Sequence, residues 1–278
     1  MSRKVVVTGG FDDLRSGDIR FLHEASRLGD VTVLLWRDEV LRKRTGQPPK
    51  FPEQERLYLL NAIRYVNRVE LVSGVTSADE LPDLPSASPD VWAVEECQAS
   101  GEKAAFCRAH GIDYRVIGRE QLKGFPDPIP PADPSAALQA PPRKKVVVTG
   151  CYDWFHSGHV RFFEEVSAYG DLFVVVGHDA NIRLLKGPGH PLLPAAERRY
   201  LCGSVRYVKE ALISSGTGWL DADPEIRRLQ ADIYAVNEDG DKGGKREYCQ
   251  RLGIQYLVLK RTPAPGLPQR SSTELRGF

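Results

Sequence analysis

Two histidines three residues apart, His156 and His159, are the strongest candidates for chemistry in this 278-residue sequence. A run of three valines and a turn that ends at Gly150 come before them, and the amphipathic segment 160–168 comes directly after. This order predicts a strand, a glycine turn and a helix, so both imidazoles would lie on one side of the first helical turn. Free backbone N–H groups and the positive end of the helix dipole lie at the same place. The stretch therefore predicts a site for a polyanion, with ordinary cap or surface histidines as the alternative.

The two halves of the chain repeat each other. The valines at 5–7 match those at 146–148, an offset of 141 (146 − 5), and after one inserted residue the pair at 55–56 matches the pair at 197–198. The matches keep their order along both halves, which indicates duplication of one structural unit. We expect a first domain at 1–120, a proline-rich linker at 121–143 and a second domain at 144–278.

Each half alternates predicted strands with predicted helices. Strands are expected at 3–8, 31–36, 69–72, 90–95 and 113–117, and at 145–149, 172–177, 210–213, 232–237 and 255–259. Helices are expected at 17–28, 53–65 and 100–110, and at 158–169, 195–207 and 243–252. Such alternation predicts an α/β fold of two tandem Rossmann-like domains, each a parallel sheet with helices on both faces. Ligands of such sheets bind beyond the carboxyl ends of the strands, where 150–159 would lie.

Composition limits the class of protein. Lys and Arg number 38 against 37 Asp and Glu, so the formal net charge of +1 gives no overall attraction to nucleic acid or to a membrane surface. Five cysteines without CxxC spacing predict reduced thiols, and no apolar run is long enough to span a bilayer. We therefore expect a cytoplasmic protein that does not insert into membranes and does not bind nucleic acid.

The motif Gly-Cys-Tyr-Asp at 150–153, followed by His-Ser-Gly-His at 156–159, resembles the signature of the HxGH nucleotidyltransferase superfamily. Within it the chain is most similar to the cytidylyltransferase family, both the tandem ethanolamine-phosphate type and the single-domain glycerol-3-phosphate type. The resemblance implies tandem nucleotidyltransferase domains in which His156 and His159 are catalytic and contact the nucleotide phosphates. It also implies that Lys186 stabilises the transferring phosphate.

Further residues match family positions. The resemblance implies nucleotide binding by Gly150, Cys151, Tyr152, Asp153, Gly158, Arg206, Asn237, Arg261, Thr262, Ser271, Ser272 and Thr273. It implies substrate binding by Asp153, Lys186 and Arg198. Lys186 could instead be a solvated loop lysine, Arg198 and Arg206 could be surface salt-bridge residues, and the Ser-Ser-Thr cluster could simply cap a last helix. The insertion 263–269 and Arg270 depart from the family's second signature.

The first half lacks the two histidines. Arg15 and Asp18 stand at the positions of His156 and His159. A carboxylate about 4 Å from a phosphate oxygen repels it by roughly 1 kcal/mol in water and about 4 at an intermediate dielectric. We therefore expect a catalytically silent first domain that packs against the second as an internal pseudo-dimer, with a homodimer left open.

The predicted reaction joins CTP and a phosphorylated alcohol to give a CDP-alcohol and pyrophosphate. Mg²⁺ is expected to bridge the phosphates, and no protein metal ligands are expected because few carboxylates cluster near the motif. One alternative is adenylyl transfer from ATP to a sugar phosphate, and another is a non-catalytic nucleotide-binding or scaffold protein. Replacing His159 with alanine should lower kcat by orders of magnitude and leave the fold intact, whereas His23 and His110 should tolerate alanine.

Overall fold

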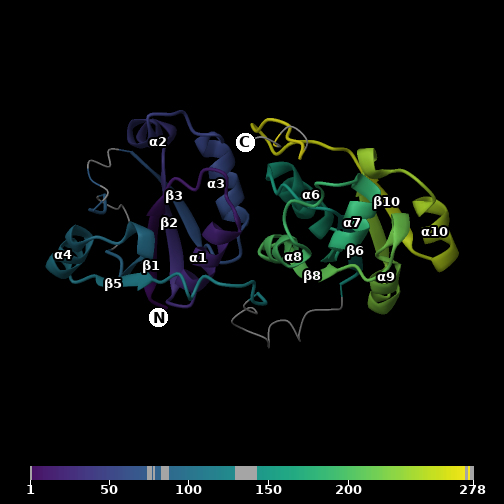
Figure 1. Cartoon of the computed structure of the whole chain (residues 1–278), viewed down its shortest axis with the longest axis horizontal. Helices are drawn as coiled ribbons and strands as arrows, with labels where there is room; N and C mark the ends of the chain where they lie inside the picture. The colour runs from purple at the N-terminus through teal and green to yellow at the C-terminus, as the bar shows by residue number, and fades with distance from the viewer. Residues whose placement is uncertain are drawn as a thin grey trace. The chain divides into compact units, whose positions relative to one another are not determined.

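The computed structural model describes residues 2–73, 77, 79–82, 88–128, 143–272 and 275, and Figure 1 shows its ribbon. The chain forms two compact units, Met1–Gly124 and Phe125–Phe278, each of which is described by itself below. Most of the expected linker lies outside the described residues. Within the described ranges, no helix has both the length and the apolar character needed to cross a bilayer.

The second unit is built on one parallel sheet of five strands. They are β6 (Lys145–Gly150), β7 (Asp171–Val176), β8 (Val208–Ile213), β9 (Ile233–Asn237) and β10 (Gln255–Leu259). Their order is β10-β9-β6-β7-β8, and all neighbours are parallel. The chain leaves β6 toward β7 on one side and returns to β9 on the other, so the carboxyl ends of β6 and β9 border a topological switch point where ligands bind.

Helices connect these strands. They are α6 (Ser157–Ser167), α7 (Asp179–Lys186), α8 (Ala195–Gly203), α9 (Asp223–Leu229) and α10 (Lys245–Leu252), with short 3₁₀ turns η2 (Gly218–Leu220) and η3 (Glu238–Gly240). The predicted α6, α8 and α10 are confirmed, whereas α7 and α9 were not expected. Lys186 is therefore the last residue of a helix, not a loop residue.

The core follows from the two-residue period of the strands. Val147, Phe173 and Tyr234 pack on one face against Ile226 of α9 and Tyr248 of α10. The alternate strand residues are buried on the opposite face, where α6 and α8 contact β7. Both faces are therefore covered, as predicted. Each fully buried apolar side chain contributes roughly 1.5–3 kcal/mol.

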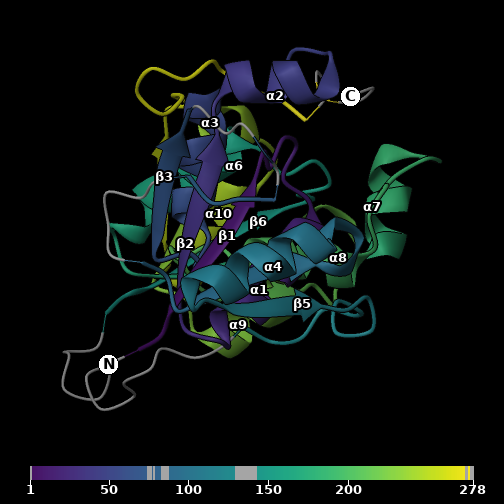
Figure 2. The ribbon, with the colours of Figure 1, turned by 90° about the vertical axis from the view of Figure 1, so that its left-hand side faces the viewer.

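The first unit repeats this topology. Its strands are β1 (Lys4–Gly9), β2 (Asp30–Trp36), β3 (Arg68–Val72), β4 (Val91–Glu95) and β5 (Asp113–Ile117), in the order β3-β2-β1-β4-β5. Its helices are α1 (Ser16–Ser26), α2 (Asp38–Thr45), α3 (Glu53–Ala62) and α4 (Gly101–His110), with a 3₁₀ turn η1 (Glu96–Gln98). Figure 2 shows α4 in front of this sheet and α2 beyond the carboxyl ends of β2 and β3. The order matches that of the second unit strand for strand, which agrees with duplication.

Candidate active site

A cavity of about 630 Å³ opens at the carboxyl ends of β6 and β9 in the second unit. Its wall combines the turn after β6, the start of α6, the end of α7, the end of β9 and the start of α10. Twelve predicted site residues line it: Gly150, Cys151, Tyr152, Asp153, His156, Gly158, His159, Lys186, Asn237, Arg261, Ser271 and Ser272. The fold therefore brings most of the predicted residues together.

His156 is both a helix cap and a cavity residue. Its side chain is 2% exposed, and its Nδ1 accepts a hydrogen bond from the backbone N–H of Gly158 at 3.1 Å. An accepting Nδ1 in a neutral ring places the proton on Nε2, which lies 3.4 Å from the Ser272 hydroxyl. A Cβ at Gly158 would come within 2.9 Å of the His156 ring, so only glycine leaves room for this arrangement. His156 is thus the N-cap of α6 and also a residue of the cavity wall, so the two interpretations from the sequence do not exclude each other.

His159 stacks on His156, with 4.0 Å between ring centroids and 25° between ring planes. Tyr152 meets the His159 ring edge-on at 5.2 Å. The His159 Nδ1 atom is buried and has no hydrogen-bond partner within the described part of the chain. Burial, then the neighbouring His156, Arg261 and Lys186, hold the pKa of His159 well below its usual range. Burial, with Arg261 and Arg270 nearby, lowers the pKa of His156 to about 4. Both rings are neutral at pH 7, so they act as hydrogen-bonding groups and not as cations.

The turn before α6 is held in an unusual backbone conformation. Tyr152 has a φ of 54°, in the left-handed region, and its side chain is buried. A Cβ at Gly150 would lie 2.8 Å from the Tyr152 ring, so the glycine is required for the ring to fold back. A non-glycine residue in this region costs about 1–3 kcal/mol, which packing of the aromatic ring offsets.

Asp153 and Arg198 hold the loops around the cavity. Asp153 accepts hydrogen bonds from the backbone N–H groups of Leu192 and Leu193. The Arg198 side chain is fully buried and donates to the carbonyls of Cys151, Gly177 and Leu193 and to the Asp179 carboxylate. Arg198 is not among the residues that line the cavity. The expectation that it contacts the substrate is corrected, because its donors are already used: it is a positioning residue.

Two other predicted residues lie outside this cavity. Arg206 is exposed and precedes β8, so it lies at the amino edge of the sheet, away from the site, and its predicted nucleotide contact is wrong. Thr262 lines a smaller adjoining pocket with Arg261 and Arg270, and its hydroxyl donates to Glu165. Thr273 lies outside the described residues.

The sequence prediction missed Lys245, the first residue of α10, which lines the cavity across from α7. Its ammonium donates to the Gly240 carbonyl at 2.7 Å, and burial lowers its pKa. Asp239 and His190 also line the cavity, and Asp239 pairs with Arg261 at 2.5 Å. The sequence did contain a signal for Lys245. Gly243 and Gly244 follow β9 and open the predicted helix 243–252, which is the same order of strand, glycine and helix that pointed to His156.

A family model described as cytidylyltransferase-like matches residues 6–134 and 147–277. The chain belongs to the cytidylyltransferase-like family. An FAD synthase of Pyrococcus horikoshii is 39% identical over 119 residues, which cover 42% of this chain and 78% of that protein. An ethanolamine-phosphate cytidylyltransferase of Dictyostelium discoideum is 26% identical over 318 residues, which cover 93% of this chain and 87% of that protein. Among solved structures, a lipopolysaccharide core biosynthesis protein from Thermoplasma volcanium is similar over 44% of this chain and 98% of its own, at 22% identity and a TM-score of 0.37.

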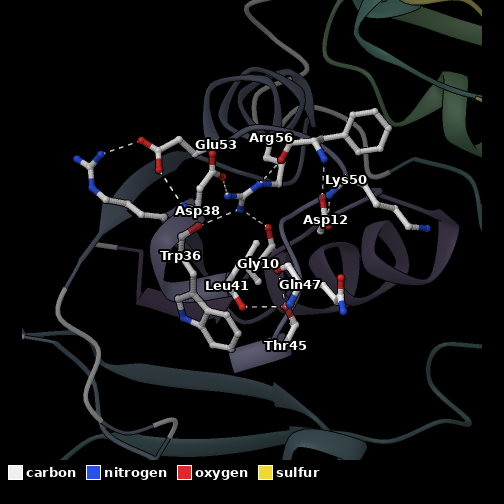
Figure 3. Close-up of polar contacts among 12 residues, drawn as sticks. Gly10, Asp12, Trp36, Asp38, Leu41, Thr45, Gln47, Lys50, Glu53 and Arg56 are labelled. Atoms are coloured by element: carbon white, nitrogen blue, oxygen red, sulfur yellow. Dashed lines mark hydrogen bonds and ion pairs between the residues drawn. The ribbon is translucent and has the colours of Figure 1, made fainter. Parts of the chain in front are cut away.

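The first cytidylyltransferase-like unit keeps the loop framework of the second. Figure 3 shows the buried Arg56 side chain donating to the carbonyls of Gly10 and Trp36 and to the Asp38 carboxylate. Arg56 also donates to the Phe51 carbonyl. These contacts reproduce, position for position, those of Arg198. Asp12 likewise accepts from the N–H groups of Lys50 and Phe51, as Asp153 does from 192 and 193.

The groups that would face phosphate differ. The Arg15 N–H donates to Asp18 at 2.8 Å, and the Arg15 guanidinium pairs with Asp13 at 2.8 Å. Burial, with Glu95 and Asp13 nearby, raises the pKa of Asp18 to about 6. The first unit keeps the framework, but the positions of the two imidazoles hold an arginine engaged with a carboxylate and a partly buried acid.

Proposed function

We propose that the second unit transfers a nucleotidyl group from a nucleoside triphosphate to a phosphomonoester. An acceptor phosphate oxygen forms a new bond to the α-phosphorus. The bond from that phosphorus to the β-bridging oxygen breaks, and pyrophosphate leaves with the electron pair. No general base is required, because the acceptor oxygen is already anionic at neutral pH.

The cavity wall that holds His156 and His159 at the start of α6, with Lys186 and Arg261 beside the same space, carries this proposal. Neutral imidazole N–H groups donate hydrogen bonds to phosphate oxygens as charge develops on them, and the positive end of the α6 dipole favours the same anion. Lys186 and Arg261 offer positive charge, and the hydroxyls of Ser271 and Ser272 offer further donors. Each preset donor contributes roughly 2.7–4 kcal/mol if the figure for oxyanion holes transfers.

Magnesium is proposed to arrive with the triphosphate. No group of three or more His, Cys, Asp or Glu side chains in the described ranges is arranged to hold a metal ion. Mg²⁺ prefers oxygen ligands, and here the phosphate oxygens would supply most of them, with the Asp239 carboxylate on the same cavity wall. Bound in this way, the ion neutralises charge on the triphosphate.

Two donor and acceptor pairs have support. CTP with a phosphorylated alcohol is favoured by the Dictyostelium relative, because that similarity extends through both units. ATP is favoured by the archaeal relatives, because the product of an FAD synthase contains an adenylyl group. We propose the CTP reaction first, on the tandem arrangement, and the ATP reaction as the second candidate.

One assay tests both. The full chain with Mg²⁺ is offered CTP, ATP, GTP or UTP, each with phosphoethanolamine, glycerol 3-phosphate, FMN or a sugar phosphate, and pyrophosphate release is measured. Release with one nucleotide and one acceptor class is the expected result. Tight binding of a triphosphate without pyrophosphate release on any acceptor would instead indicate a non-catalytic nucleotide-binding protein.

The first unit is proposed to be catalytically silent, since Asp18 and the paired Arg15 offer no free donor pair equivalent to the two histidines. Variants Arg15→Ala and Asp18→Ala of the full chain should release pyrophosphate at the wild-type rate. A large loss in either would assign the first unit a part in the reaction. Whether the two units form a pseudo-dimer stays a prediction.

A further inference from the structure

Three leucines beside the cavity are exposed to solvent. Leu184 and Leu185, in the last turn of α7, are 72% and 53% exposed, and Leu192 in the following loop is 52% exposed. They flank Lys186 and His190, both of which line the cavity. We name Leu184, Leu185 and Leu192 the apolar rim.

The first unit shows which side chains this part of the fold accepts. Helices α2 and α7 have eight residues each, and each ends before a glycine of positive φ, Gly46 and Gly187. In both helices the first residue, an aspartate, accepts from the buried arginine. The two helices therefore correspond residue by residue.

The positions of the apolar rim carry cations in the first unit. Lys43 and Arg44 correspond to Leu184 and Leu185, and both are exposed. Lys50 corresponds to Leu192, because its N–H and that of Leu192 bond to the equivalent residues Asp12 and Asp153. Figure 3 shows the Lys50 side chain extending away from the loop framework.

The two units keep the helix but differ in the residues at these exposed positions. A helix of the same length forms with lysine and arginine at these positions, so the leucines are not required for it to form. Exposed apolar clusters beside a binding site mark contact with a ligand or partner. Because the rim adjoins Lys186 and His190, we take its occupant to be whatever enters this cavity.

A fourth exposed apolar side chain lies close in the chain fold to a cavity-lining residue of another segment. Trp219 is 53% exposed, and its indole lies beside Gly243 and Gly244, within 3.8 Å of the position that a Cβ would take at either. These glycines directly precede Lys245, which lines the cavity. Apolar surface thus adjoins cavity-lining lysines on two segments.

We propose that the acceptor is a soluble phosphomonoester with an apolar or aromatic body, which packs on the apolar rim while its phosphate enters the cavity. This inference depends on the proposed nucleotidyl transfer and specifies its acceptor class. A small polar acceptor such as glycerol 3-phosphate would leave the three leucines in water. An apolar body would cover them and remove their apolar surface from water, which stabilises the complex.

The test compares hexyl phosphate and phenyl phosphate with glycerol 3-phosphate on the full chain. Binding is measured by calorimetry, and pyrophosphate release is measured with whichever nucleotide supports turnover. The double variant L184K/L185R carries the residues of the first unit, and L184Q/L185Q makes the same sites polar without charge. V116Q, at a side chain 43% exposed in the first unit, is the matched control.

We expect hexyl and phenyl phosphate to bind at least tenfold more tightly than glycerol 3-phosphate. Both double variants should lose this preference by about tenfold, with the binding of the nucleotide and of glycerol 3-phosphate unchanged in L184Q/L185Q. V116Q should behave as wild type. The inference would be overturned if the double variants lost affinity equally for polar and apolar acceptors, or lost none. It would also be overturned if the leucine substitutions changed only self-association of the chain or its binding to lipid vesicles. If calorimetry shows the preference for apolar phosphomonoesters but no pyrophosphate is released, the proposed reaction is refuted and the proposed acceptor site is not.

Discussion

The imidazoles of His156 and His159 lie face to face, 4.0 Å between centroids, with Gly158 between them in the chain. Two protonated rings at this distance would repel each other, and burial adds to the cost of charging either. Both pKa values are accordingly lowered, that of His156 to about 4. The pair is therefore an uncharged set of hydrogen-bonding groups on the cavity wall, and the positive charge of the cavity resides on Lys186, Lys245 and Arg261.

Replacing His159 with alanine tests this role. We expect kcat for pyrophosphate release to fall by about 100-fold or more, since a preset donor to the reacting phosphate is lost. His110→Ala is the control, because His110 is exposed and its contacts lie within α4. Near-normal turnover in His159→Ala, with circular dichroism unchanged, would exclude the assignment.

His23 is not a suitable control, although the sequence suggested that it was. Its side chain is fully buried in the first unit and stacks on Tyr65 at 4.2 Å between ring centroids. Alanine there would leave a cavity, so the expected tolerance is wrong. The pattern at 17–28 predicted that His23 lies in a helix, but it did not show that the imidazole faces the core.

The lowered pKa of His156 predicts how stability depends on pH. Its value is about 4 in the folded chain against an ordinary 6.5, so the unfolded state binds the proton first as the pH falls. The free energy of unfolding should fall between about pH 6.5 and pH 4, by up to about 1.4 kcal/mol per pH unit from this residue. Melting temperatures at pH 7 and pH 5 should differ less in His156→Gln than in wild type. An equal pH dependence in the two proteins would mean that His156 is not buried as a neutral ring.

Asp18 predicts the opposite sign. Its pKa is raised to about 6 in the folded chain from an ordinary 3.8, so protonation favours the folded state and that benefit is lost as the pH rises through 6. Asp18→Asn should therefore raise the free energy of unfolding by about 1–2 kcal/mol at pH 7, since the amide oxygen still accepts from Arg15. Denaturation at pH 4, where Asp18 is protonated in the folded state, should show no such gain. Destabilisation at pH 7 would contradict the buried carboxylate.

The sequence located the sheet and most of the cavity because its signals are local. The valine run before Gly150, the spacing of His156 and His159 and the repeat of the two halves can all be read without tertiary contacts. Helix α7 was missed because its eight residues give little more than two turns in which a helical period can be seen. The role of Arg198 could not be read either, since only the fold shows that three carbonyls from different loops converge on its guanidinium.

The buried arginines allow a matched pair of variants. Arg198→Ala should destabilise the second unit by about 3–5 kcal/mol, because it leaves three buried carbonyls and the Asp179 carboxylate without their donor. It should also abolish pyrophosphate release, since the loops bearing Cys151 and Leu193 lose their tie. Arg56→Ala removes the same contacts in the first unit and should lower the free energy of unfolding of that unit by a similar amount. The rate of pyrophosphate release per folded molecule should stay near that of the wild type. Thermal unfolding and initial rates measure the two effects. Equal loss of activity in both variants would show that the first unit supports the reaction.

The last prediction concerns the glycine between the histidines. A Cβ at Gly158 would lie 2.9 Å from the His156 ring, closer than side-chain carbons approach in proteins, so Gly158→Ala should rotate that ring away from Gly158 N–H. Loss of the cap costs about 1 kcal/mol, and displacement of a ring near the reacting phosphate should lower kcat by about 100-fold. The equivalent Gly17 has no atom within 4 Å of its Cβ position, and it lies at the same place in α1. Gly17→Ala should therefore be neutral or slightly stabilising, by up to about 1 kcal/mol, because alanine is the better helix former. Initial rates and melting temperatures of the two variants measure the difference. Equal behaviour of the two alanine variants would mean that the stacked geometry of His156 and His159 is not what the reaction requires.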